Sequence, residues 1–185
     1  MPSRRPRPRI AISMGDPAGV GPEVIVKAAG ALMRSRRGPQ LIVLGDLATK
    51  RAAAGRIPGA PTPVKWNDET PELPLPYGLG LRQVGKLSRA AARPGHPSRE
   101  GGAASFDYVT AGVELVMRGE ADALVTGPIS KEWWDRAGHH YPGHSELLAE
   151  MAGVRRWRMM FGGGTLKVAL VTVHLELAKV SRRLT

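Results

Sequence analysis

Residues 10–33, IAISMGDPAGVGPEVIVKAAGALM, hold an apolar run, a glycine-rich turn and a helical pattern in direct succession. The run Ile10–Met14 has the apolar character of a buried strand. A helix is predicted for Pro22–Met33, because proline is well tolerated in the first turn of a helix. The succession of strand, turn and helix predicts the first unit of an α/β fold.

Three further apolar runs predict buried strands, at Gln40–Gly45, Ala121–Thr126 and Leu166–Thr172. The second of these leads into a helix at about Ser130–Arg136, and the third into a helix from Glu176. Their hydrophobicity is continuous, as in strands of a parallel sheet that are covered on both faces. The pattern therefore predicts a doubly wound, largely parallel α/β fold.

The intervening chain gives weaker signals. Ile57–Pro76 is rich in proline and predicts loop or edge structure, and Leu81–Val84 predicts a short strand. Ser88–Gly102 is polar and rich in helix breakers, which predicts a flexible loop. Apolar residues at helical spacing predict helices at Phe106–Met117 and Leu147–Ala152.

Composition limits the class of protein. The 185 residues suit one domain, or one domain and part of another, and 42% hydrophobic residues suffice for a packed core. The chain has no cysteine, which excludes disulfides and thiolate metal sites. No apolar run approaches the roughly 20 residues that a membrane span needs, so no membrane partner is expected.

The net charge of +11 allows two interpretations. A polyanion-binding surface is one, but no nucleic-acid-binding motif is present, and we expect no nucleic-acid partner. The other is a basic tail, since residues 1–9 hold four arginines among prolines and predict a disordered segment. No apolar segment follows this tail as in a secretory signal, which favours a cytoplasmic protein.

The loop Met14–Glu23 carries three glycines and two prolines, and it runs into a helix N-terminus. Such a helix end can bind an anion through its free N–H groups. A tight structural turn, with Asp16 capping backbone amides, is an equal alternative. The loop matches neither a Walker A motif nor a dinucleotide-binding GxGxxG motif.

Polar residues follow the later strands, at the edge where ligands bind in open α/β sheets. Ser130 is predicted to cap a helix, which places Lys131 near the positive end of the helix dipole. A bound anion would offset the repulsion between this lysine and the dipole; the alternative is a solvated surface lysine. His144 and Ser145 offer adjacent donors at a helix start, suited to a carboxylate or phosphate. His174 follows a strand and suits a metal ligand, an acid/base or a buried core histidine.

Two further histidines, His139 and His140, lie close to this segment. They could contribute to a metal cluster, but the Pro and Gly before His144 separate the side chains. Paired loop histidines are more often at the surface, and we favour that interpretation.

Four segments together carry a resemblance to a known family. They are GDPAGVGPE, TGPISK, YPGHSELLAE and VALVTVHLEL, in this order from Gly15 to Leu177. The chain resembles the 4-hydroxythreonine-4-phosphate dehydrogenase family of pyridoxal phosphate biosynthesis from about Ile10 onward. The first loop is also similar to the GDGIGPE turn of isocitrate and isopropylmalate dehydrogenases, and the resemblance implies their fold.

The resemblance implies an oxidation, with decarboxylation, of a phosphorylated hydroxy amino acid, 4-phosphohydroxy-L-threonine, by NAD or NADP. A divalent metal (Zn, Mg or Co) would act as Lewis acid. By motif match, His144 and Ser145 contact substrate, His174 is a metal ligand, and Lys131 is a catalytic-cleft residue. The full-length family members are expected to act as homodimers.

The chain departs from the family pattern in length. We expect residues 10–185 to be the N-terminal portion of a two-lobed dehydrogenase, truncated at its C-terminus, because two further metal-binding histidines and most nicotinamide contacts are not found. One imidazole cannot hold a catalytic metal tightly, so little or no activity is expected of this chain alone. Alternative functions are a dehydrogenase of phosphothreonate or phosphoerythronate and a non-catalytic phosphate-binding remnant.

Overall fold

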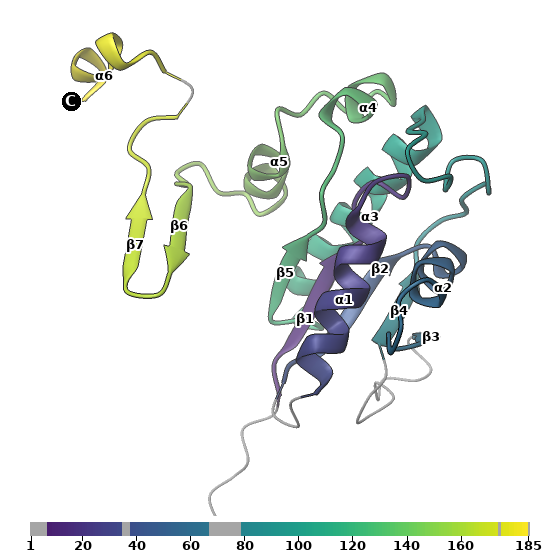
Figure 1. Cartoon of the computed structure of the whole chain (residues 1–185). Coiled ribbons are helices and arrows are strands. Elements are labelled where there is room, and N and C mark those ends of the chain that lie inside the picture. Colours follow the sequence, from purple (N-terminus) through teal and green to yellow (C-terminus); the bar gives the residue numbers. More distant parts are fainter. Residues whose placement is uncertain (1–6, 35–37, 67–78, 174, 185) are drawn as a thin grey trace, which may run out of the picture. The chain divides into compact units, whose positions relative to one another are not determined.

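The computed structural model describes residues 7–34, 38–66, 79–173 and 175–184. The chain divides into two compact units, Met1–His144 and Ser145–Thr185. The first unit contains a sheet with helices, and the second contains a hairpin, a short C-terminal helix and all but the first residue of the helix at His144–Met151 (Figure 1). No helix in the part of the chain that the structure describes is long and apolar enough to cross a membrane.

A five-stranded parallel sheet forms the centre of the first unit (Figure 1). Its strand order is β3-β4-β2-β1-β5, and every neighbouring pair is parallel. The strands are β1 (Arg9–Ser13), β2 (Gln40–Gly45), β3 (Pro63–Lys65), β4 (Leu79–Gln83) and β5 (Ala123–Thr126). The predicted parallel α/β fold is therefore confirmed.

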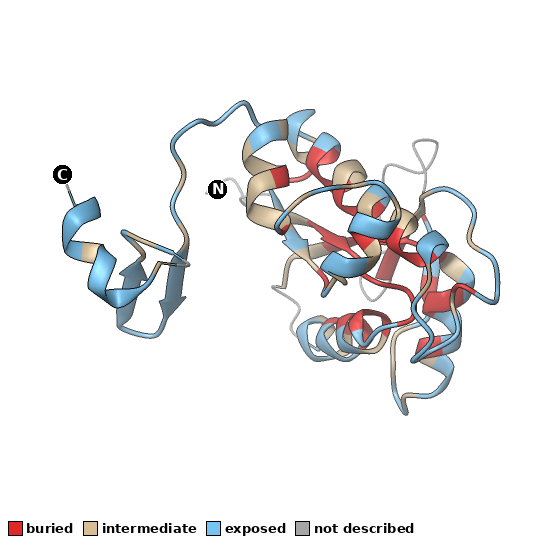
Figure 2. Ribbon diagram, turned by 90° about the horizontal axis from the view of Figure 1, so that it is seen from above, coloured by how far each residue is buried: buried red, intermediate tan, exposed pale blue. Residues whose placement is uncertain are grey.

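Helices cover both faces of this sheet. They are α1 (Gly21–Met33), α2 (Leu47–Gly55) and α3 (Arg99–Met117), and the short helix α4 (Lys131–Arg136) packs on α3. The helices α1 and α2 pack against each other, whereas α3 packs against β1, β2 and β5 from the other side (Figures 1 and 2). The core joins Val26 of α1, the buried strand β2 and Tyr108 of α3, all fully buried.

Two helices differ from the prediction. The helix α2 was not predicted, because its alanine-rich sequence has no stripe of large apolar residues; Asp46 caps it by accepting hydrogen bonds from the N–H and the hydroxyl of Thr49, both 2.7 Å. The helix α3 begins at Arg99, well before the predicted start at Phe106. Its early glycines allow close packing, since a Cβ at Gly102 would lie 2.2 Å from the carbonyl oxygen of Trp133.

The fourth predicted strand is present, but the prediction that it is buried is wrong. The strand β7 (Leu166–Ala169) pairs antiparallel with β6 (Met160–Gly163), and all residues of both strands are exposed. A two-stranded hairpin has no second layer of its own, so a run of apolar residues does not become buried by forming it. The predicted helix from Glu176 is present as α6 (Leu177–Arg183), with Glu176 as its N-cap residue.

The two edges of the described sheet differ. At one edge, β3 begins with Pro63. At the other, Val125 of β5 is 53% exposed, and an apolar groove of about 380 Å³ lies between β5 and α1. Val24 and Leu32 of α1 line this groove together with Val125.

Lys50 of α2 is completely buried (0% exposed), although lysine is rarely buried. Its Nζ donates a hydrogen bond to the carbonyl oxygen of Pro22, 2.9 Å away in the first turn of α1. Burial disfavours the charged ammonium and lowers the pKa of Lys50 to about 7. The side chain thus joins α2 to the start of α1.

Replacing Lys50 by methionine should change how stability depends on pH. Because the folded-state pKa is lowered, the unfolded chain binds a proton that the folded chain does not between pH 7 and about 10. The free energy of unfolding should therefore rise with pH in this window, by up to about 1.4 kcal/mol per pH unit from this group. Urea unfolding of Lys50→Met should lack this contribution. Exposed Lys27→Met is the matched control, and equal pH slopes for both variants would contradict the assignment.

Candidate active site

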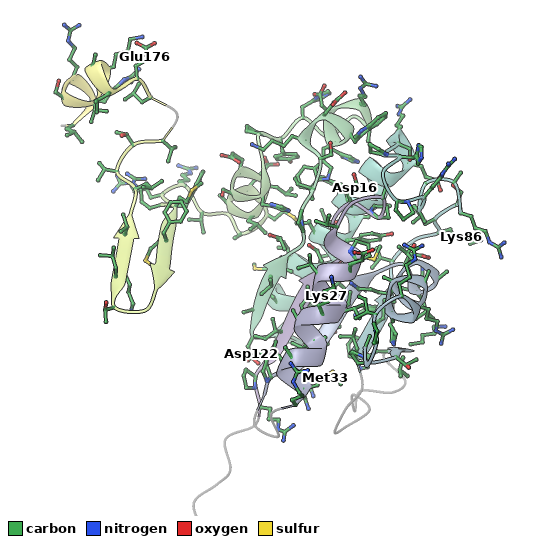
Figure 3. The ribbon with its side chains drawn as sticks, in the orientation of Figure 1. Asp16, Lys27, Met33, Lys86, Asp122 and Glu176 are labelled. Atoms are coloured by element: carbon green, nitrogen blue, oxygen red, sulfur yellow. The ribbon has the colours of Figure 1, made fainter. Side chains whose placement is uncertain are left out.

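The chain segments that follow β1 and β5 contact each other through their backbones. The N–H of Asp16 donates to the carbonyl oxygen of Pro128 (2.9 Å), and the N–H of Gly127 donates to the carbonyl oxygen of Ser13 (2.9 Å). We call this contact, formed by residues 13–16 and 127–128, the β1–β5 crossing. It lies at the carboxyl edge of the sheet, where Figure 3 labels Asp16.

Glycine is required at two positions of the β1–β5 crossing. Gly15 has φ of 74°, and a Cβ there would lie 2.3 Å from the carbonyl oxygen of Pro128. A Cβ at Gly127 would lie 2.7 Å from the carbonyl oxygens of Ser13 and Met14. These distances are shorter than the van der Waals contact between a carbon and an oxygen atom, so any side chain would force the two segments apart.

Asp16 is buried and folds back onto its own loop. Its Oδ1 accepts a hydrogen bond from the N–H of Ala18 at 2.9 Å. This contact matches the predicted capping interpretation of the loop. The helix α1 starts at Gly21 with Pro22 in its first turn, and no side chain caps it.

The helix α4 holds Lys131 on a firmly anchored element. Ser130 caps it as predicted, with its Oγ accepting from the N–H of Trp133 at 3.4 Å. Trp134 is completely buried, and its Nε1 donates to the Oγ of Ser105 of α3 at 2.7 Å. Lys131, the first residue of α4, is exposed.

His144 lies near Lys131. It is the first residue of α5 (His144–Met151), and its ring meets that of Trp134 edge-on, with centroids 5.6 Å apart. Burial lowers the pKa of His144, and the positive charge of Lys131 lowers it further. The imidazole is therefore neutral at pH 7, next to a cation.

The Nε2 atom of His144 is buried and has no hydrogen-bond partner among the described residues. An unsatisfied buried nitrogen costs about 1–3 kcal/mol. A ligand group that hydrogen-bonds Nε2 would recover this energy. Ser145 follows in α5 and is partly buried, at the start of the second unit.

The neighbouring histidines have other contacts. The ring of His139 stacks on Phe106 of α3, with centroids 3.7 Å apart and planes 3° from parallel. The exposed His140 places Nδ1 2.5 Å from a carboxylate oxygen of Asp135. Each ring is thus engaged separately.

Metal ligation receives no support from this part of the chain. Among the described residues, no group of three or more His, Asp or Glu side chains is arranged to hold a metal ion. His174, the predicted metal ligand, lies outside the described residues. The described residues therefore do not by themselves form a metal site.

The motifs predict Lys131 and His144 in one cleft, and in the structure the positive charge of Lys131 acts on the imidazole of His144. Trp134 was missed, although two adjacent tryptophans in a short polar helix are a signal of an anchored element. Its buried ring contacts His144 and fixes α4 against α3.

Replacing Gly15 by alanine should destabilise the first unit by at least about 3 kcal/mol, measured by urea unfolding. The substitution adds both the strain of a left-handed backbone and a clash with Pro128. Gly119→Ala is the matched control, since Gly119 has φ of 72° but no atom within 4 Å of a Cβ. It should cost only about 1–2 kcal/mol. Equal losses would show that the clash is unimportant.

Replacing Lys131 by methionine should raise the pKa of His144, because one of its two lowering influences is removed. Burial remains, so the pKa should stay below the ordinary value. Titration of the histidine ring protons by NMR measures this. Lys27→Met should leave the His144 titration unchanged, and an unchanged titration in Lys131→Met would disprove the proximity.

Comparisons with known proteins identify the family. The family model for pyridoxal phosphate biosynthetic protein PdxA matches residues 38–185. The 4-hydroxythreonine-4-phosphate dehydrogenase of Geobacter metallireducens is 43% identical, over 97% of this chain and 52% of its own length. A putative D-threonate 4-phosphate dehydrogenase of Bradyrhizobium diazoefficiens is 36% identical, over 95% of this chain and 50% of its own.

A solved structure shows the same fold. The crystal structure of a 4-hydroxythreonine-4-phosphate dehydrogenase from Burkholderia phymatum superposes with a TM-score of 0.85 and 31% identity, over 97% of this chain and 54% of the other. The chain thus spans about half the length of the relatives it matches. Motifs, sheet order and comparisons lead to one conclusion: the chain belongs to the family of the pyridoxal phosphate biosynthetic protein PdxA.

Proposed function

We propose that this chain carries the substrate-facing part of a dehydrogenase that oxidises 4-phosphohydroxy-L-threonine in pyridoxal phosphate biosynthesis. The observation that carries the proposal is the pairing of Lys131 with a neutral, half-buried His144 at the carboxyl edge of the sheet. Relatives named 4-hydroxythreonine-4-phosphate dehydrogenase support the choice of reaction.

Three side chains have proposed roles toward the substrate. Lys131 supplies a positive charge for an anionic group of the substrate, and among the described residues it forms no ion pair with a carboxylate. The neutral imidazole of His144 offers Nε2 to a substrate hydroxyl or carboxylate. Ser145 offers its hydroxyl beside it. These groups bind and orient the substrate, which favours reaction by holding it in one geometry.

The cofactor and the metal are proposed from the resemblance. NAD or NADP would accept the hydride, and a divalent metal (Zn, Mg or Co) would polarise the reacting hydroxyl. We propose His174 as one metal ligand. Because structural and catalytic metals generally need about three protein ligands, the remaining ligands would have to come from outside the described residues.

We further propose that turnover needs more protein than this chain, and that the complete enzyme is a homodimer. The chain spans about half the length of its relatives. With the substrate-facing residues present and the metal ligands incomplete among the described residues, the 185-residue chain should bind substrate but oxidise it poorly.

A second substrate is favoured by one observation. A relative named putative D-threonate 4-phosphate dehydrogenase is 36% identical to this chain. Its sequence identity is similar to that of several relatives named 4-hydroxythreonine-4-phosphate dehydrogenase. Both substrates are phosphorylated hydroxy acids, and Lys131 and His144 suit either.

Calorimetric titration with both phosphorylated compounds tests the proposal. We expect Lys131→Met and His144→Phe each to weaken binding about tenfold, the loss of one hydrogen bond to a charged group. Lys27→Met, on the exposed face of α1, should bind as the unaltered chain does. The preferred compound identifies the substrate. Unchanged binding in both site variants would rule out this site.

A turnover assay with NAD or NADP and added divalent metal tests the requirement for further protein. We expect less than about one hundredth of the rate of a full-length relative, as expected when metal ligands are missing. Rapid metal-dependent reduction of the cofactor by the 185-residue chain would contradict this expectation.

A further inference from the structure

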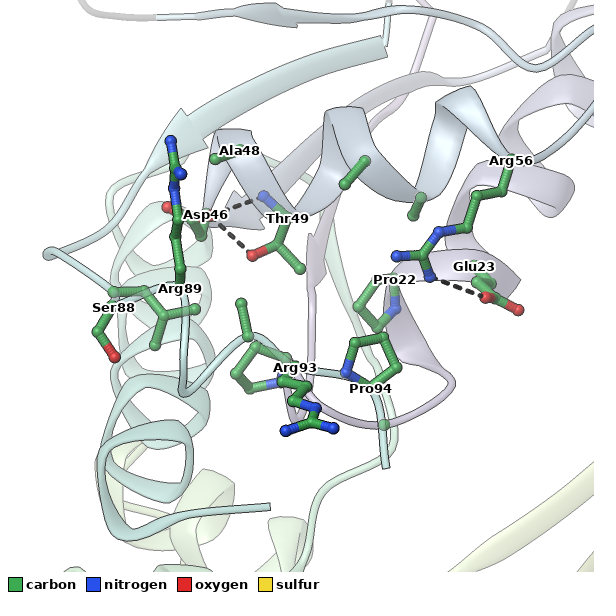
Figure 4. A pocket seen from close by; sticks show the side chains of 16 residues that line it. Pro22, Glu23, Asp46, Ala48, Thr49, Arg56, Ser88, Arg89, Arg93 and Pro94 are labelled. Atoms are coloured by element: carbon green, nitrogen blue, oxygen red, sulfur yellow. Dashed lines mark hydrogen bonds and ion pairs between the residues drawn. The ribbon is translucent and has the colours of Figure 1, made fainter. Parts of the chain in front are cut away.

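A second pocket opens at the carboxyl edge of the sheet, apart from Lys131 and His144. It lies between the loop after β1, the starts of α1 and α2, and the segment 87–94 that follows β4 (Figure 4). Its volume is about 410 Å³, within the usual range of small-molecule sites. Neither Lys131 nor His144 lines it.

The floor of this pocket is apolar. Apolar side chains from four parts of the chain line it, namely Pro17, Pro22, Ala52, Ala53, Leu87 and Ala92. Asp46 is also part of the wall, but its carboxylate already accepts hydrogen bonds from Thr49 and Gln83. The surface therefore favours a ligand with an apolar body.

Three arginines surround the opening (Figure 4). Arg56 of α2 pairs with Glu23 at 3.9 Å, a long contact between two half-exposed side chains that contributes little. Arg89 and Arg93 have no ion pair or hydrogen bond from their guanidinium groups among the described residues. The opening thus offers two cations without a resident counterion.

The loop that carries Arg89 and Arg93 is held in place. Ser88 donates from its N–H (2.6 Å) and its hydroxyl (2.7 Å) to the carboxylate of Glu100, which lowers the pKa of that carboxyl. The N–H of Gly95 donates to the carbonyl oxygen of Ala18 (2.8 Å). A turn closed by the hydrogen bond from the N–H of Ala92 to the carbonyl oxygen of Ser88 (3.2 Å) carries Arg89, and Figure 4 shows the guanidinium groups of Arg89 and Arg93 at different sides of the opening.

We propose that this pocket binds a small organic anion, an apolar ring or chain bearing one phosphate or carboxylate. The apolar lining receives the body of the ligand, and an arginine at the opening, Arg89 or Arg93, binds its anionic group. Two sources share this chemistry: a nucleotide, including the adenylyl part of a dinucleotide, and a free phosphorylated ring metabolite. The proposal does not depend on substrate binding at Lys131 and His144.

Phenyl phosphate is the probe, titrated into the full chain while alanine methyl signals are followed by NMR. We expect the signals of Ala52, Ala53 and Ala92 to shift. The double variant Arg89→Gln/Arg93→Gln should raise the dissociation constant at least about tenfold. Arg51→Gln is the matched control, because this exposed arginine of α2 does not line the pocket.

Two companion ligands separate the contributions. Benzyl alcohol has the ring without the charge, and inorganic phosphate has the charge without the ring; both should bind more weakly than phenyl phosphate. Shifts confined to Ala28 and Ala29 in the groove beside β5 would overturn the proposal, as would equal binding of phenyl phosphate by the double variant and the control.

AMP and pyridoxine phosphate are titrated in the same way to distinguish the two sources. Tighter binding of AMP, with the same methyl shifts, assigns the pocket to a nucleotide, and tighter binding of pyridoxine phosphate assigns it to a ring metabolite. If phenyl phosphate and both of these compounds fail to shift the pocket methyls, the proposal is wrong. Retained substrate binding at Lys131 and His144 would show that only the pocket assignment fails.

Discussion

The architecture depends on one close contact, where the backbone leaving β1 passes the backbone leaving β5. At the β1–β5 crossing, hydrogen bonds join Asp16 to Pro128 and Gly127 to Ser13, and there is no space for a side chain at Gly15 or Gly127. Sheet pairing alone would align the strands but would leave their following loops free. The crossing fixes both loops together, and with them the starting points of α1 and α4.

The candidate site builds on this frame through packing. The helix α4 starts directly after the crossing, and Trp134 anchors it to α3 through Ser105. The same indole ring lies against His144, so a single buried side chain positions the helix of Lys131 and the imidazole. A neutral imidazole beside an ammonium group is the electrostatic result, since protonating His144 would add a second positive charge in a half-buried place.

Sequence patterns correctly predicted the elements that depend on residues near to one another in the sequence. Gln40–Gly45 was predicted residue for residue, since β2 is covered on both faces, and the caps at Asp16 and Ser130 follow from side chains that bond within three residues. The predicted start of α3 is wrong because glycine usually breaks a helix, whereas Gly102 here admits the backbone of α4. Long-range causes of this kind leave no local pattern.

The same limit explains the other differences. Lys50 has an ordinary helical context, and nothing near it in sequence indicates that Pro22 will accept its hydrogen bond. The apolar run at Leu166–Thr172 resembles a core strand. Such a run indicates that burial would be favourable, but it does not indicate which other element would cover the strand. The motifs predicted Lys131 and His144 in one cleft, but the buried indole of Trp134 that contacts His144 was not predicted. The role of His174 stays a prediction.

The unequal edges of the sheet have a consequence for how it can grow. Proline at the start of β3 offers no N–H to a further strand, which discourages addition on that side. Beside β5 the apolar groove next to Val125 would gain contacts with the side chains of an added strand. One edge of the described sheet thus lacks an N–H group at Pro63, whereas the other leaves the apolar side chain of Val125 exposed.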